Sequence, residues 1–135
     1  AGAGESRRLA QLHDLFATLL DAARSPLPWP HSSRSLLSAS RDYVFAEHYQ
    51  NVGLQAIKKR VPDYQPRPFM QPCRCVIDED FFKLIEWADG RLELYDLNRD
   101  FGESRDLSQV PDQSPRIRTL HSILGEKLGP FRENA

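Results

Sequence analysis

One stretch decides the fold of this 135-residue chain: Phe82-Lys83-Leu84-Ile85-Glu86-Trp87-Ala88-Asp89-Gly90-Arg91-Leu92-Glu93-Leu94-Tyr95-Asp96-Leu97. Its centre, Asp89-Gly90, lies between two runs that are rich in aromatic and branched aliphatic residues. An Asp-Gly pair tolerates the positive φ that a tight type I′ turn requires. The stretch therefore predicts a β-hairpin with strands over residues 82–88 and 91–97.

A two-residue turn also predicts the register of this hairpin. Ile85 would face Leu94 and Lys83 would face Asp96 on one side, with Leu84 opposite Tyr95 on the other. Lys83 and Asp96 are then interpreted as a structural cross-strand pair and not as catalytic groups. Because both faces of the hairpin are largely apolar, we expect it to be packed between other elements inside a small α+β unit.

Periodicity and turn residues predict the other elements. Apolar residues recur at helical spacing over residues 6–24, which predicts an amphipathic helix that ends at Ser25-Pro26. A linker is expected over residues 26–40, strands over 43–49 and 74–77, and an irregular segment with four prolines over 50–72. Ser114-Pro115 is typical of a helix start, and it precedes one apolar face made of Ile117, Leu120, Ile123, Leu124 and Leu128. The expected fold is α+β: a small antiparallel sheet of about four strands, a C-terminal helix packed on it, and an N-terminal helix before it.

Composition excludes several classes of function. The formal net charge is −1, which argues against nucleic acid as a general partner. No apolar run approaches the roughly 20 residues of a membrane span, and we expect no signal peptide at the start. Cys73 and Cys75 are one residue apart, too close for an ordinary loop-closing disulfide, and we interpret them as small packing residues.

The hairpin and the residues after it resemble the end of a sulfatase. That family's C-terminal subdomain reads Arg-x-Val-Arg, then Tyr-Lys-Leu-Ile, a turn, and Glu-Leu-Tyr-Asp-Leu-x-x-Asp-Pro-x-Glu-x-x-Asn-Leu. Here Arg74-Cys75-Val76 is similar to the opening, and residues 93–97 are identical to Glu-Leu-Tyr-Asp-Leu. The offsets that follow are occupied by Asp100, Glu103, Asp106 and Leu107. The chain departs from the pattern at three positions: Ile77 replaces the second Arg, Phe101 the Pro and Asp106 the Asn.

Segments before the hairpin extend the resemblance. Residues 12–21 resemble the family's His-x-Asp-Leu-x-Pro-Thr-Leu-Leu helix, which closes the large catalytic domain, although Ala17 stands where Pro is usual. Arg34-Ser35-Leu36-Leu37 is similar to the following link, and Val44-Phe45-Ala46-Glu47 to the first strand of the subdomain. The resemblance implies that residues 1–40 belong to the end of a catalytic domain and residues 41–135 form the C-terminal subdomain.

The same resemblance implies chemistry that this chain does not carry. Sulfatases work through a formylglycine made from the Cys or Ser of Cys/Ser-x-Pro-x-Arg, with a divalent cation, usually calcium. Neither Cys73-Arg74-Cys75 nor any serine fits that motif. We therefore expect no catalytic residue here, an inactive isolated chain, and a sulfatase catalytic domain as its partner, with the formylglycine and calcium in that domain. Two alternatives stay open: a free-standing module that binds anionic glycans, and a piece of a phosphonate or phosphodiester hydrolase of the same alkaline-phosphatase superfamily.

Basic residues and one histidine are the candidates for contact with substrate. Lys58, Lys59, Arg60, Arg67 and Arg74 are opposed in their segment only by Asp63. They form either a solvated loop or a surface that steers an anionic, sulfated substrate. His48 follows the strand expected over residues 43–49, and in the family that strand end points toward the pocket entrance. The other histidines, His13, His31 and His121, lack metal-ligand spacing, so no metal site is expected.

The N-terminal helix carries a further expectation. Leu12, Phe16 and Leu19 form its apolar stripe. If this stripe serves to contact a catalytic domain, then the isolated chain should expose it and self-associate.

Overall fold

The computed structural model describes residues 6–26, 32–38, 40–49, 57, 59–63 and 71–131. These fall into two compact units. The first, here the N-terminal unit, comprises Ala1–Val44 with Asp78–Asp80, and the second, here the sheet unit, comprises Phe45–Ile77 with Phe81–Ala135. The irregular segment expected over residues 50–72 lies mostly outside the described residues.

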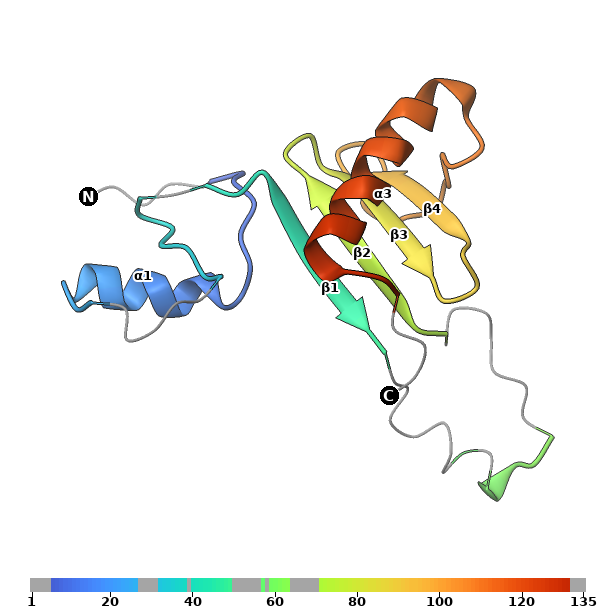
Figure 1. Ribbon diagram of the computed structural model, residues 1–135, viewed down its shortest axis with the longest axis horizontal. Helices are drawn as coiled ribbons and strands as arrows, with labels where there is room; N and C mark the ends of the chain where they lie inside the picture. The colour runs from blue at the N-terminus through green and yellow to red at the C-terminus, as the bar shows by residue number, and fades with distance from the viewer. Residues whose placement is uncertain are drawn as a thin grey trace. The chain divides into compact units, whose positions relative to one another are not determined.

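A four-stranded sheet carries the fold, in the order β1 (Tyr43–His48), β2 (Cys73–Asp78), β3 (Phe82–Trp87) and β4 (Leu92–Asp96). β3 pairs antiparallel with β2 on one side and with β4 on the other. A short 3₁₀ helix, η2 (Pro111–Gln113), leads into α3 (Ser114–Leu128), which lies across the sheet and contacts β3 (Figure 1). The α+β fold predicted from the sequence is confirmed.

Each face of the sheet has its own apolar layer. Val76, Leu84 and Leu94 are fully buried and share one face in the observed register. Glu86, on the same face, reaches His121 of α3, so this face is the one that α3 covers. Leu120 and Leu124 of α3 are also buried and complete this layer. Ile85, Trp87 and Tyr95 form a second cluster on the opposite face, with Cys73, Cys75 and Leu97 packed against it.

The predicted hairpin register is wrong by one residue. Leu84 pairs with Leu94, and Trp87 N donates to Arg91 O at 2.9 Å, so the loop has three residues instead of two. Gly90 N donates back to Trp87 O at 2.9 Å, and Gly90 has a φ of +82°. This is a tight turn followed by a glycine in the left-handed region, a common three-residue hairpin loop. The longer loop places Leu94 beside Leu84 under α3 and turns Tyr95 to the other face.

The predicted Lys83 and Asp96 pair is wrong for the same reason. Lys83 stands opposite Tyr95, and Asp96 stands opposite Phe82. The Lys83 ammonium instead binds Glu103 Oε1 at 2.8 Å, in the segment that follows β4. Lys83 therefore has a structural role, as interpreted, but with a different partner.

The N-terminal helix is shorter than predicted. The periodicity suggested residues 6–24, whereas α1 covers Asp14–Ala22. The Asp14 carboxylate accepts a hydrogen bond from Gln11 N at 2.9 Å, and Asp14 N donates to Gln11 O at 2.9 Å, which makes a turn directly before the helix. At the other end Arg24 adopts a φ of +52°, and Ser25 N closes the last turn on Leu20 O at 2.8 Å. Within the described ranges, no helix has the length and apolarity that a membrane crossing needs.

Candidate functional site

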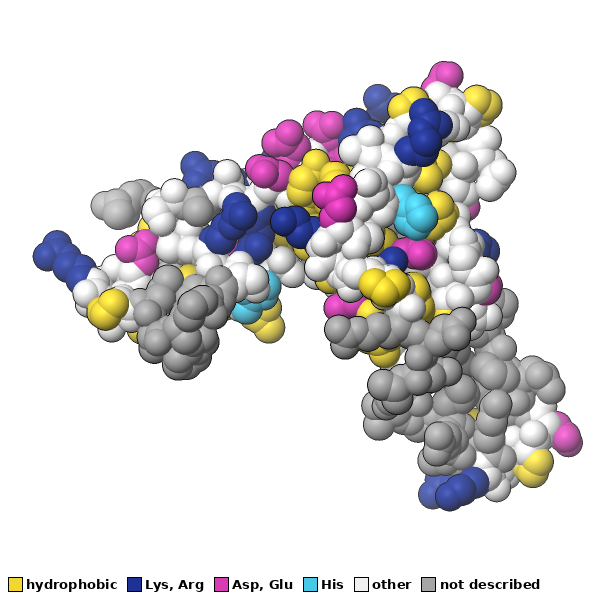
Figure 2. Space-filling model, in the orientation of Figure 1, with side chains coloured by type: hydrophobic (Ala, Val, Ile, Leu, Met, Phe, Trp, Pro, Cys, Tyr) yellow, Lys and Arg dark blue, Asp and Glu magenta, His cyan; other side chains and the backbone are white. Residues whose placement is uncertain are grey.

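The predicted substrate-contact residues lie on separate segments of the sheet unit. His48 is the last residue of β1, and its side chain is exposed. Lys59 and Arg60 are also exposed, whereas Lys58 and Arg67 lie outside the described residues. In Figure 2, acidic and basic side chains are interspersed over the sheet unit on the face in view. His48, Lys59 and Arg60 are thus accessible to a ligand.

Arg74 has a different environment from the other candidates. Its side chain is only 4% exposed, and Nε donates to Glu86 Oε2 at 2.7 Å. Nη1 donates to Gly129 O at 2.7 Å, just beyond the end of α3. A buried guanidinium needs such partners, because leaving the charge unpaired in the interior is unfavourable. The guanidinium of Arg74 therefore ties the sheet to the end of α3.

Carboxylates of the sulfatase-like stretch shape the turns that follow β4. Asp96 Oδ1 accepts from Asn98 N at 3.1 Å, and Asp106 Oδ1 accepts from Leu94 N at 3.0 Å and from Ser108 N at 2.8 Å. Asp100 accepts from Arg105 N and from the Ser104 hydroxyl, both at 2.8 Å, and the first of these bonds leads the causes that lower its pKa. Such local side-chain bonds are the usual way in which Asp stabilises turns. Asp96, Asp100 and Asp106, which belong to the sulfatase-like stretch, thus stabilise turns in this chain.

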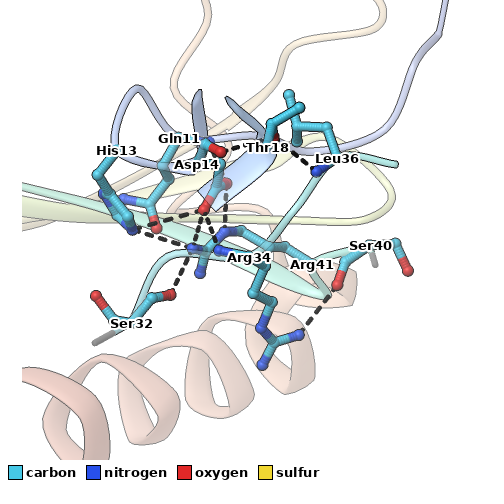
Figure 3. Close-up of polar contacts among 9 residues, drawn as sticks. All are labelled: Gln11, His13, Asp14, Thr18, Ser32, Arg34, Leu36, Ser40 and Arg41. Atoms are coloured by element: carbon cyan, nitrogen blue, oxygen red, sulfur yellow. Dashed lines mark hydrogen bonds and ion pairs between the residues drawn. The ribbon is translucent and has the colours of Figure 1, made fainter. Parts of the chain in front are cut away.

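A buried carboxylate organises the N-terminal unit (Figure 3). Asp14 is fully buried, and its oxygens accept from Gln11 N at 2.9 Å, Arg34 N at 2.8 Å and Arg41 Nε at 2.7 Å. Arg41 Nη2 also binds Asp14 Oδ1 and donates to Ser32 O at 2.7 Å. The hydrogen bonds from Arg41 hold the pKa of Asp14 well below its usual range. We call this arrangement, centred on Asp14 and Arg41, the Asp14 clasp.

Two neighbours of Asp14 extend the clasp. Thr18 Oγ1 donates to Asp14 O at 2.7 Å and accepts from Leu36 N at 2.9 Å. His13 Nε2 lies 3.0 Å from Arg41 Nη2, and since a guanidinium only donates, this imidazole nitrogen is the acceptor. Asp14 and Thr18, one helical turn apart, therefore bind α1 to residues 34–41 through hydrogen bonds. No short sequence motif marks this clasp, and the one usable signal is an Asp beside the apolar stripe of the predicted helix.

Neither cysteine is a prepared nucleophile. Cys73 and Cys75 are free and half-buried, and burial raises the pKa of both thiols. A thiol with a raised pKa holds little of the reactive thiolate at neutral pH. Burial likewise raises the pKa of Tyr95 to about 12, with further support from the hydrogen bond that its hydroxyl donates to Glu93 Oε2 at 3.1 Å. These three residues are therefore assigned to packing.

Metal-binding residues do not gather in the part of the chain that the structure describes. No group of three or more His, Cys, Asp or Glu side chains there could hold a metal ion. The sulfatase resemblance implies its calcium in the catalytic domain, and the described residues of this chain offer no ligand set for that ion. The described surface does expose an imidazole at the end of β1 and two basic side chains, Lys59 and Arg60.

Solved structures share this fold. A candidate sulfatase from Bacteroides thetaiotaomicron and the 2-O GAG sulfatase BT1596 are each 23% identical, cover 84% of this chain, and superpose with a TM-score of 0.63. The phosphonate monoester hydrolase of Agrobacterium radiobacter is 18% identical, covers 90% of this chain, and gives the same TM-score of 0.63. No protein-family model and no curated protein matches the sequence.

The matches cover only part of each of these proteins. The chain spans 23% of the length of the first two and 25% of the third. At these identities the likeness establishes a common fold. The chain thus has the fold of about a quarter of a sulfatase-like hydrolase, which fits the C-terminal subdomain expected from the sequence.

Proposed function

We propose that this chain is the C-terminal subdomain of a sulfatase-like sulfuric ester hydrolase. In that role it completes the fold of a catalytic domain and shapes the mouth of the substrate site. The observation that carries the proposal is the partial match: most of this chain superposes on a minor part of sulfatases. The residues that carry the sequence resemblance support it, because the same carboxylates build the turns around β4.

His48, Lys59 and Arg60 are the groups with which the subdomain would meet an anionic substrate, and Lys58 belongs to the same basic run. Their exposure is what such a role needs, because steering acts on charges that the substrate can approach. Arg74 would contribute differently, since its guanidinium is bound to Glu86 and Gly129. It would stabilise the part of the fold that presents the exposed residues.

The first test of the proposal is the activity of the isolated chain. We expect the purified chain not to hydrolyse an aryl sulfate above the buffer background, with or without added calcium. The physical reason is the absence of the nucleophile motif from the sequence. Turnover that survives repurification and disappears when a residue of this chain is mutated would overturn the proposal.

The second test uses the longer protein that the proposal implies. Replacing Lys58, Lys59 and Arg60 with Ala should raise KM for a sulfated oligosaccharide and leave KM for a small aryl sulfate nearly unchanged. The oligosaccharide carries additional anionic groups that a basic surface attracts, and the aryl sulfate does not. Equal effects on both substrates, or none, would assign these residues to a solvated loop. Raised salt should reduce the difference in KM by screening.

A second candidate is a phosphonate monoester hydrolase of the same superfamily. It is favoured by one observation, namely that the Agrobacterium radiobacter enzyme covers 90% of this chain, against 84% for the two sulfatases. Parallel assays of the longer protein with a sulfate monoester and a phosphonate monoester separate the candidates. A clear preference for the phosphonate would replace the sulfatase assignment.

A further inference from the structure

Among the strands that the structure describes, the one that ends at His48 has a single neighbour in the sheet. β1 stands at the edge, beside β2, and its last three residues, Ala46, Glu47 and His48, are exposed. The end of an edge strand is prone to local opening, because few buried contacts hold it. A side chain that contacts a ligand from such a position needs a second restraint.

An aromatic contact directly after β1 supplies that restraint. The ring of Tyr49, the residue after His48, meets the ring of Phe131 edge-on, with centroids 6.1 Å apart and planes at 65°. This geometry is a favourable one for an aromatic pair. Arg74 also contacts Phe131: its guanidinium carbon lies 5.2 Å from the ring centroid, within cation–π range.

Arg74 is itself a fixed support. It is buried, and its hydrogen bonds to Glu86 and to Gly129 O leave its guanidinium one orientation. Gly129 then turns the chain off the end of α3 with a φ of +75° and a ψ of −165°, a region that is essentially restricted to glycine. Two residues later the chain reaches Phe131. The stack therefore runs from the buried ion pair, through Phe131, to the residue that follows His48.

We propose that Phe131, packed between the Arg74 guanidinium and the Tyr49 ring, is a positioning residue for the His48 end of β1. The role of this end toward substrate rests on the proposed function, but the positioning itself does not. Phe131 lies 83 positions after His48 in the sequence, so the C-terminal segment controls the geometry of the first strand of the sheet unit.

Hydrogen exchange on the full 135-residue chain tests the positioning role. In Phe131→Ala, the amides of Glu47, His48 and Tyr49 should exchange about tenfold faster, as the loss of one aromatic pair and one cation–π contact predicts. Exchange within β3 and β4 should not change. Phe131→Tyr should restore the rate, since it keeps the ring, and Gly129→Ala should reproduce the Phe131→Ala effect. Phe101→Ala is the matched control, because Phe101 is 88% exposed.

Two exchange results would overturn the inference. One is an unchanged rate at Glu47, His48 and Tyr49 in Phe131→Ala. The other is an equal acceleration of every amide in the sheet unit, which would reveal a general loss of stability. If the alanine variant does not fold, Phe131→Leu provides the same comparison, because it retains apolar volume but no ring.

Binding of a heparin-derived sulfated disaccharide then tests whether the placement of His48 by Phe131 affects contact with an anionic ligand. If wild type binds it, both His48→Ala and Phe131→Ala should raise Kd, and the double variant should be no weaker than His48→Ala alone. Additive effects, or an unchanged Kd in Phe131→Ala, would overturn the role of Phe131 in placing His48. If wild type does not bind the disaccharide, the substrate role of His48 fails, while the exchange result still decides the positioning role.

Discussion

The sheet unit and the N-terminal unit differ in the interactions that stabilise each of them internally. In the sheet unit, apolar layers lie on both faces of the sheet, and Leu84 and Leu94 are completely buried. In the N-terminal unit a buried carboxylate, Asp14, binds several segments, whereas Leu12 and Leu19 are 85% and 70% exposed. Figure 2 shows apolar side chains at the surface of the N-terminal unit. The sheet unit is built on buried apolar layers, whereas the N-terminal unit buries Leu9 and Ala17 and organises its backbone around one carboxylate.

This difference predicts how each unit responds to change. Apolar burial is distributed over many contacts, so that a single contact at the surface of the sheet unit matters little. The Asp14 clasp concentrates several hydrogen bonds on one side chain, so that a single substitution removes them together. The sheet unit has one exception to this rule, because the buried ion pair between Arg74 and Glu86 also concentrates its stabilisation on single side chains.

The largest effect is expected from Arg74→Met. Removing one partner of a buried ion pair leaves Glu86 without its guanidinium partner, and a loss of this kind typically costs about 3–5 kcal/mol. Urea denaturation should show this loss in the sheet unit. Arg99→Met is the control, because the Arg99 side chain is 88% exposed, and a change within roughly 0.5 kcal/mol is expected there. A loss below roughly 1 kcal/mol for Arg74→Met would mean that water reaches Glu86 and replaces its partner.

Asp14→Asn should come next and act on the N-terminal unit. An amide cannot neutralise Arg41 and accepts at only one of its two atoms, so the clasp should weaken by about 1–3 kcal/mol. Exchange of the Arg34 and Leu36 amides, which point into the clasp, measures the effect directly. Asp42→Asn, at an exposed position nearby in the sequence, should leave both rates unchanged. Comparable acceleration in the two variants would show that the clasp contributes little.

The lowered pKa of Asp14 should make the stability of the Asp14 clasp depend on pH. A carboxyl with a lowered folded-state pKa contributes stability that is complete above its unfolded value, about 3.9, and that disappears as pH falls toward the folded value. Protection of the Arg34 amide should thus be constant from neutral pH to about 5 and should decrease in stronger acid. Asp14→Asn should remove this acid-dependent part.

A smaller effect is expected from Tyr95→Phe in the sheet unit. The hydroxyl donates to Glu93, so its removal should cost about 1 kcal/mol at neutral pH. The pKa of Tyr95 is raised to about 12, which means that the folded state disfavours the phenolate. The stability of the wild-type chain should fall as pH rises from about 10 toward that value, and the Tyr95→Phe variant, which has no phenol to ionise, should not show this fall. Parallel alkaline melts of both proteins would reveal it, and identical melts would contradict it.

The smallest effect on folding is expected from changing Leu12 and Phe16 to polar residues. Both side chains are exposed, so the free energy of unfolding should hardly change. Association should change instead, because an exposed apolar stripe favours self-contact, and the variant should have the mass of a monomer. Light scattering over a range of concentrations makes the comparison. A monomeric, concentration-independent mass for wild type would contradict the expected self-association.

Local sequence patterns predicted the elements better than their exact pairing. Alternating apolar residues, Asp89-Gly90 and Ser114-Pro115 were sufficient for the strands of the hairpin and for α3. They could not distinguish a two-residue loop from a three-residue loop, because both need a glycine with positive φ at the same place. Helical periodicity similarly overextended α1, since it does not report that the Asp14 carboxylate is used by Arg34 and Arg41 twenty or more positions away.

Candidate site residues were harder to judge than the fold. Arg74 belongs to a basic run in the sequence, yet its burial beside Glu86 follows from strand pairing and not from composition. His48 was chosen from the resemblance alone, and its contact to substrate stays a prediction. The Tyr49, Phe131 and Arg74 stack joins three distant segments, so no short motif could have revealed it.

The turn-forming carboxylates after β4 have a consequence for what this stretch indicates. Asp96, Asp100 and Asp106 bond to backbone amides of their own turns and of β4. Their hydrogen bonds stabilise these turns whatever ligand or substrate the chain meets. The stretch is therefore informative about the framework, and evidence for a reaction has to come from residues that the framework does not use for its own turns.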